Sequence, residues 1–163
     1  MNATLNPWER FLGDRDPIDV LADVPARIEA MAAAWTPERL ERSYAPGKWT
    51  ARQILLHLAE GEAMMSVRLR MALTQDDFTF QPYDQDKWIG REPAGATGPL
   101  ALAAFVAMRA VELPLFRSLT PADRTRACRH PERGRMTVET VLRTLAGHDL
   151  NHLAQLEQID RAH

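Results

Sequence analysis

Three histidines are the residues of this chain best placed to do chemistry together. His148 and His152 lie one helical turn apart in the segment GHDLNHLAQLEQI, and His57 lies in the segment GKWTARQILLHLAEGE. A helix brings residues i and i+4 onto one face, so two imidazoles can converge on one point and a facing helix can supply the third. Three neutral imidazoles that leave a coordination position open are typical of a reactive divalent-metal site rather than a closed structural one.

A simpler interpretation is that these histidines only pack in the core. A single histidine on an apolar helix face more often packs there than binds a metal. However, two adjacent buried imidazoles without partners carry a free-energy cost that a metal ion removes. The other two histidines lack this context, since His130 lies in a polar connection and His163 is the last residue. Both are expected to be solvated.

Polar residues near the histidines are candidates for supporting roles. Glu60 lies three residues after His57 and therefore on the same helix face. It could act as a fourth ligand, as a catalytic general base or as a rim residue paired with a basic neighbour. Asp149 points about 100° away from its neighbour His148 around the helix, so at most it supports a ligand. Arg68 is expected on the solvated surface, with an anionic group of the substrate as its alternative partner.

Capping signals mark the helices that must position these residues. Asp16 and Pro17 suit the N-cap and the first position of a helix, Thr50 with Gln53 forms a capping box, and Thr137 can cap the last helix. Apolar residues recur at helical spacing after each signal. The predicted helices span about residues 17–35, 51–73, 99–114 and 138–159.

The pattern as a whole predicts an all-α protein. The buried side of the third helix is predicted to consist of Leu100, Ala104, Ala107 and Val111. Residues 74–98 have no helical period and are rich in Asp, Gln, Gly and Pro, which indicates a long loop of the kind that often carries function. No strand alternation of useful length is visible. Four amphipathic helices predict a four-helix bundle, with residues 1–163 as a single domain.

Composition and charge exclude several classes of protein. The 163 residues are 45% hydrophobic and 26% charged, with a net charge of −2, so no basic surface for nucleic acid is expected. We also expect no membrane association, because no apolar run approaches the roughly 20 residues of a span. The N-terminal residues do not resemble a secretory signal, and the one cysteine, Cys128, cannot form an internal disulfide. A cytoplasmic location is expected.

Several segments, taken in order, resemble the DinB-like superfamily, which includes the YfiT-type proteins. They are an opening helix that begins with DP, the turn PGKWT, the helix segment HLAEGE, the loop segment PYDQDKW and the C-terminal segment RMTVETVLRTLAGHDLNHLAQLEQI. The resemblance implies a bundle of down-up-up-down topology, frequently a homodimer. It also implies a divalent ion, nickel or zinc, held by His57, His148 and His152. The family commonly has Asp where this chain has Glu60, which leaves the role of Glu60 open.

The resemblance and the three histidines are compatible with three functions. The first is transfer of a low-molecular-weight thiol to an electrophile, in which the metal holds the thiol as thiolate. The second is hydrolysis of a small substrate by a metal-bound water, with Glu60 as the base. The third is a non-enzymatic, stress-linked binding or dimerisation module. The ligand set alone does not distinguish the first two, because imidazole ligands suit both zinc and nickel and both reactions.

Overall fold

Four long helices begin where side chains cap them. The computed structural model describes residues 6–93 and 95–162 of the chain. Asp16 Oδ1 accepts a hydrogen bond from Ile18 N at 2.7 Å, and Thr50 and Gln53 form the predicted capping box. The side chain of Thr137 accepts from Thr140 N. The helices that follow are α2 (Pro17–Ala32), α4 (Ala51–Thr74), α6 (Gly98–Ser118) and α8 (Val138–Arg161).

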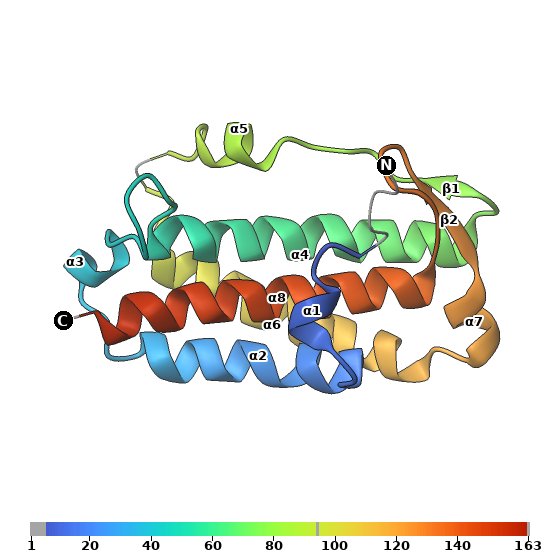
Figure 1. The fold of residues 1–163 in the computed structure, drawn as a ribbon, viewed down its shortest axis with the longest axis horizontal. Coiled ribbons are helices and arrows are strands. Elements are labelled where there is room, and N and C mark those ends of the chain that lie inside the picture. Colours follow the sequence, from blue (N-terminus) through green and yellow to red (C-terminus); the bar gives the residue numbers. More distant parts are fainter. Residues whose placement is uncertain (1–5, 94, 163) are drawn as a thin grey trace.

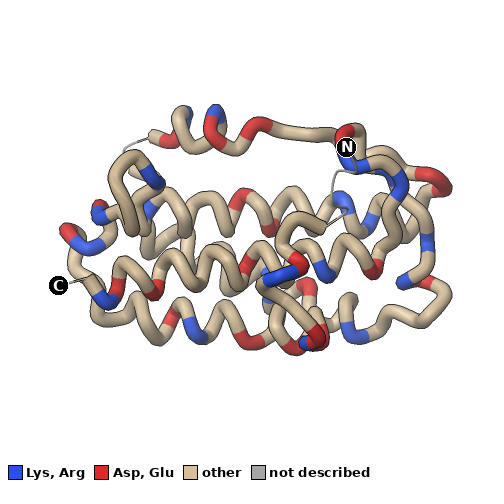
Figure 2. The backbone as a smooth tube through the Cα atoms, in the orientation of Figure 1, with Lys and Arg blue, Asp and Glu red and all other residues tan. Residues whose placement is uncertain are grey.

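These helices form the predicted four-helix bundle with down-up-up-down topology. In Figure 1, α2 and α8 run in one direction along the long axis, and α4 and α6 run in the other. Because α4 and α6 are parallel, residues 75–97 must return along the whole bundle to connect them. Acidic and basic residues are interspersed along the helices visible in Figure 2. The buried apolar side chains form one hydrophobic core between the helices.

The connections carry short elements. The helices α1 (Glu9–Leu12), α3 (Pro37–Leu40), α5 (Gln85–Ile89) and α7 (Pro121–Thr125) are one turn or little more. Three short strands, which the sequence did not reveal, also lie in these connections. The strand β1 (Phe78–Thr79) pairs in parallel with β2 (Ala127–His130), which pairs antiparallel with β3 (Gly134–Thr137). Strands of two to four residues are too short to show the alternation by which a strand is recognised.

A buried ion-pair network joins the four long helices. Arg109 of α6 donates to both carboxylate oxygens of Glu62 on α4, at 2.9 and 2.6 Å, and to Asp149 Oδ2 on α8 at 2.9 Å. It also donates to the backbone carbonyl of Leu21 on α2 at 2.9 Å. Burial opposes the charge of Arg109, but the two carboxylates outweigh it and raise the pKa of the guanidinium. Arg109 therefore remains a cation in the centre of the bundle.

This network explains why the predicted buried face of α6 is wrong. Leu100 and Val111 are 65% and 68% exposed, whereas Arg109 and Glu112 are buried. Glu112 accepts hydrogen bonds from side chains of α4, so the interior contacts of α6 are partly ionic and its outer face is apolar. The length and composition of α6 alone would allow it to cross a membrane. In this fold it packs against α2 and α4 and contributes Phe105 to the core.

Candidate metal centre

The three histidines meet between α4 and α8. The Nε2 atom of His148 lies 2.9 Å from Nε2 of His57 and 3.1 Å from Nε2 of His152. All three ligand atoms lie within 4.8 Å of one another. The predicted convergence of an i, i+4 pair with a histidine from a facing helix is therefore present in the fold.

Neighbouring acceptors favour one tautomer of two of these imidazoles. The Nδ1 atom of His152 lies 2.8 Å from Gln155 Oε1, and Nδ1 of His148 lies 3.4 Å from Asp149 Oδ1. An amide oxygen and a carboxylate only accept hydrogen bonds, so both contacts favour the tautomer in which Nδ1 carries the proton. In that tautomer the Nε2 atoms of both histidines point unprotonated lone pairs toward the same space. Orientation of a ligand histidine through its second nitrogen is characteristic of metal sites.

The electrostatic environment keeps the imidazoles of His57 and His152 neutral. Burial lowers the pKa of His57 to about 3, and the neighbouring His148 contributes to the shift. Burial, followed by His148 and His57, holds the pKa of His152 well below its usual value. Burial opposes ionisation of Asp149, but Arg109 outweighs this effect and lowers the pKa of the carboxyl. Neutral imidazoles beside an ionised carboxylate suit the binding of a cation.

Two tryptophan rings pack against the histidines. The ring of Trp49 lies 4.8 Å from that of His57 and stacks on His152 with an interplanar angle of 13°. Trp8 meets the ring of His148 edge-on at 5.8 Å. Gly147 allows this approach, since a Cβ at this position would lie 2.8 Å from Trp8 Cβ and 2.5 Å from its carbonyl oxygen. Part of the N-terminal segment is thereby held against α8 next to the metal-site candidate.

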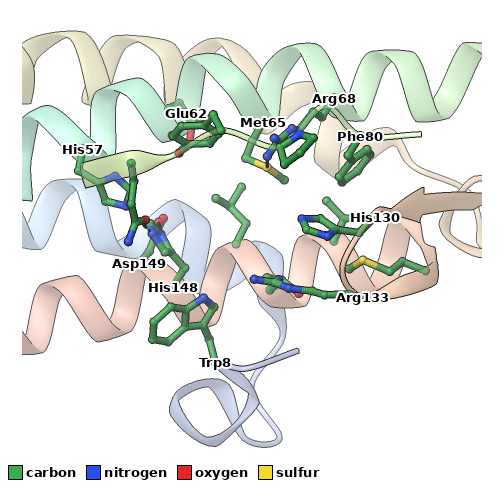
Figure 3. A pocket seen from close by; sticks show the side chains of 18 of the residues that line it. Trp8, His57, Glu62, Met65, Arg68, Phe80, His130, Arg133, His148 and Asp149 are labelled. Carbon is green, nitrogen blue, oxygen red and sulfur yellow. Dashed lines mark hydrogen bonds and ion pairs between the residues drawn. The ribbon is translucent and has the colours of Figure 1, made fainter. Parts of the chain in front are cut away.

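A cavity of about 350 Å³ opens from the histidines along the bundle (Figure 3). His57 and His148 lie at one of its ends, as Figure 3 shows, and His130 and Arg133 lie toward the other. Gly61 lines the cavity, and a Cβ there would meet no atom within 4 Å. Gly61 therefore leaves open space in the cavity on the helix that carries His57. A space of this size suits a small molecule.

A second cavity of about 330 Å³ also reaches the histidines. His148, Trp8 and Gln85 line both cavities, and His152 and Trp49 line the second one. The histidine cluster is therefore accessible from two adjoining spaces. Two substrates could approach it at the same time.

The structure places Glu60 apart from these cavities. Its side chain is not among those that line either space. Burial and a hydrogen bond to Glu92 raise the pKa of Glu60 to about 7, and its Oε2 atom is buried without a partner in the described part of the chain. The Glu60 carboxyl group therefore holds its proton more tightly than an exposed glutamic acid does. Its catalytic role stays a prediction.

Asp149 occupies the supporting position that the sequence allows. Its Oδ1 atom lies 3.4 Å from Nδ1 of His148, and its Oδ2 atom forms an ion pair with Arg109. The carboxylate therefore connects a candidate ligand to the ionic network in the core. The sequence did not indicate that Arg109 and Glu62 take part.

Two expectations about basic residues require correction. Arg68, expected on the solvated surface, is only 9% exposed and donates to the carbonyl of Gln81. His130, expected in a solvated connection, lies in β2, is half-buried and lines the cavity. Both corrections have the same cause, because the short sheet and the segment after β1 cover this end of α4. His163 lies outside the described residues.

Comparisons with known proteins agree with this fold. A family model described as the DinB superfamily matches residues 21–156. A "Putative metal-dependent hydrolase" of Oceanobacillus iheyensis is 27% identical over 158 residues, which cover 97% of this chain and 87% of that protein. The "Putative metal-dependent hydrolase YfiT" of Bacillus subtilis is 28% identical over 146 residues, covering 88% of this chain and 82% of YfiT.

A solved structure shows the same fold. It is described as "YfiT from Bacillus subtilis is a probable metal-dependent hydrolase with an unusual four-helix bundle topology". The TM-score is 0.81 at 28% sequence identity, and the match covers 89% of this chain and 84% of the YfiT chain. The bundle topology described above is therefore shared with that protein.

Proposed function

Because this chain belongs to the DinB superfamily, we propose that it is a metal-dependent enzyme acting on a small molecule. One divalent ion, zinc or nickel, is held by His57, His148 and His152. The observation that carries the proposal is the convergence of three Nε2 atoms in a buried space. Relatives named as metal-dependent hydrolases support the same general function.

The donor set fits such an ion. With both Nδ1 atoms protonated, Nε2 of His148 and Nε2 of His152 face each other as lone pairs only 3.1 Å apart. This arrangement is unfavourable unless a cation or a proton lies between them. Imidazole nitrogens suit both zinc and nickel. A divalent ion bound there would lower the pKa of a coordinated thiol or water and so supply a nucleophile at neutral pH.

We propose thiol transfer to an electrophile as the reaction. Transfer needs two substrates, and two cavities share His148. It also needs no strong general base once the thiol is ionised. The carboxylates near the histidines support this choice, since Glu62 and Asp149 both form ion pairs with Arg109. Neither is free to take a proton from a substrate.

Hydrolysis is the second candidate, and the names of the relatives favour it. A hydrolase requires a group that accepts a proton from water. Glu60 is the candidate from the sequence, and the raised pKa of about 7 suits a base at neutral pH. To act in this way, the Glu60 side chain would have to leave Glu92 and turn into the cavity.

The experiment compares the two reactions on one metal-loaded preparation. The purified protein is loaded with zinc, nickel or cobalt and assayed for consumption of a thiol with a chloro-dinitrobenzene electrophile, and for hydrolysis of nitrophenyl acetate. Transfer predicts thiol consumption that is lost in His57→Ala and kept in Glu60→Gln. Hydrolysis predicts ester cleavage that is lost in both variants. Protein that retains no metal and has neither activity would identify a non-enzymatic binding module.

Cobalt gives a readout that is independent of turnover. A thiol bound to cobalt produces a charge-transfer band in the near ultraviolet, because sulfur donates electron density to the ion. The band should appear on thiol addition to the wild-type protein and be absent in His148→Ala. Glu132→Gln is the matched control, because Glu132 lines the same cavity but offers no metal-binding group to the cluster.

A further inference from the structure

The end of the cavity away from the histidines carries two arginines, Arg68 and Arg133, which we call the arginine end. Arg68 comes from α4, and Arg133 comes from the turn between β2 and β3. In Figure 3 both side chains lie beside His130 at the far end of the space from His57. Neither arginine has a carboxylate partner in the described part of the chain. Residues 1–5, MNATL, contain no carboxylate side chain.

Arg68 has unused hydrogen-bonding capacity although it is buried. Its guanidinium donates to the carbonyl of Gln81 and contacts Met65 Sδ at 3.9 Å. It also lies 5.3 Å from the ring centre of Phe80 and 5.4 Å from that of Tyr83. The Nε atom is buried and has no hydrogen-bond partner among residues 6–93 and 95–162. A buried charged donor without an acceptor is costly, and native proteins normally pair it.

The positive charges of the two arginines also repel each other. Burial and the neighbouring Arg133 lower the pKa of Arg68, and burial lowers the pKa of Arg133. Glu132 is the nearest acidic neighbour in the chain, but it is exposed and forms no ion pair with Arg133 among the described residues. Elsewhere the protein pairs its buried arginine, Arg109, with two carboxylates. The charges of the arginine end therefore favour an anion placed beside them.

We infer that the arginine end binds an oxyanion of the substrate, a carboxylate or phosphate group. Guanidinium groups bind such anions through paired hydrogen bonds, and His130 and Tyr83 line the same part of the cavity. The inference extends the proposed function, since it assigns a substrate class to the same cavity. The substrate is a small anionic molecule whose reacting group lies at the histidines and whose anionic group lies at the arginines.

The middle of the cavity fits an apolar body between these groups. Leu58 and Met65 of α4 face the space, as do Val141 and Leu145 of α8. Apolar walls with a few polar groups at fixed positions are typical of small-molecule sites, and the polar groups set orientation. A substrate with an aliphatic or aromatic linker between its anionic group and its reacting group would contact the arginine end, the apolar middle and the histidines at once.

The test uses matched probes that differ only in the anionic group. Mercaptohexanoate and mercaptohexanol are titrated calorimetrically into zinc-loaded protein, and hexanoate and hexanol into chelator-treated protein. Charge-assisted hydrogen bonds to a buried arginine predict that the carboxylate binds roughly tenfold or more tightly than the alcohol. The preference should be lost in Arg133→Met and in Arg68→Met. It should remain in Arg135→Met, because Arg135 is exposed in the same hairpin and does not line the cavity.

Phosphate is tested separately with inorganic phosphate on the metal-free protein. Binding that is lost in Arg133→Met, with no preference for hexanoate, would assign a phosphate rather than a carboxylate. If hexanoate and phosphate both fail to bind, or if the preference survives in both arginine variants, the inference is overturned. If zinc does not bind but the carboxylate preference persists, the proposed metal function fails while the oxyanion site stands. Arg133→Met keeps the test valid if Arg68→Met does not fold, because Arg133 is only half-buried.

Discussion

Acidification should destabilise the metal-free protein through its buried histidines, and the effect can be calculated for His57. Burial and the neighbouring His148 lower the pKa of His57 to about 3 in the folded state. The pKa of an unfolded-chain histidine is about 6.5. Between these values the unfolded chain binds a proton that the folded protein does not bind. Stability is therefore complete above about pH 6.5 and is lost as the pH falls toward about 3.

The size of the stability loss follows from the folded-state and unfolded-state pKa values of His57. Within this window each pH unit removes about 1.4 kcal/mol for one such histidine. Between about pH 7.5 and about pH 5, His57 alone lowers the free energy of unfolding by about 2 kcal/mol. His152 is shifted in the same direction and adds to the loss. Domains of this size are stable by only about 5–15 kcal/mol, so the combined effect is measurable.

Urea unfolding with excess chelator measures the free energy of unfolding of the metal-free protein at each pH. The wild-type protein and His57→Gln are compared across the pH range, and Gln removes the titration while keeping a polar side chain. The variant should lose about 2 kcal/mol less than the wild type between about pH 7.5 and about pH 5. His130→Gln serves as a control with a smaller effect, because His130 is only half-buried. Equal losses in the wild type and His57→Gln would refute a buried neutral imidazole at this position.

Three further predictions concern the core, the ligands and the outer surface. Arg109→Met leaves Glu62 and Asp149 as unpaired buried charges, so it should lower the free energy of unfolding by about 3–5 kcal/mol in urea titrations. The double variant His148→Ala/His152→Ala should lose the single bound ion measured by elemental analysis, and stoichiometric metal in it would contradict the proposed site. The chain should form a homodimer through helix faces away from the histidines. Leu100→Glu on the exposed apolar face of α6 should then give a monomer by light scattering, whereas a wild-type monomer at micromolar concentration would refute the dimer.

The parts of the site that could be predicted from the sequence depend on local geometry. The pair His148 and His152 lies on one helix, and its spacing alone determines that both imidazoles share a face. The helix starts were predicted because Asp16, Thr50 and Thr137 accept hydrogen bonds from the first turns that follow them. Such signals need no knowledge of the rest of the fold.

The buried face of α6 could not be predicted in this way. A hydrophobic pattern assigns the apolar side of a helix to the core, and that rule selected Leu100 and Val111. In this protein the core side of α6 also carries Arg109 and Glu112, whose partners lie on other helices. The charges are satisfied only once the bundle is assembled, so their burial is invisible in the local pattern.

The arginine end of the cavity depends on contacts that are still more distant in the sequence. Phe78 pairs with Cys128 across the parallel strands β1 and β2, and this pairing brings His130 and Arg133 over the end of α4. The metal-site candidate, by contrast, needs only the packing of α4 against α8. The two ends of the cavity are therefore specified by different parts of the chain. Substitutions in the β2–β3 turn should change which anion binds while the affinity of the histidines for a metal stays the same.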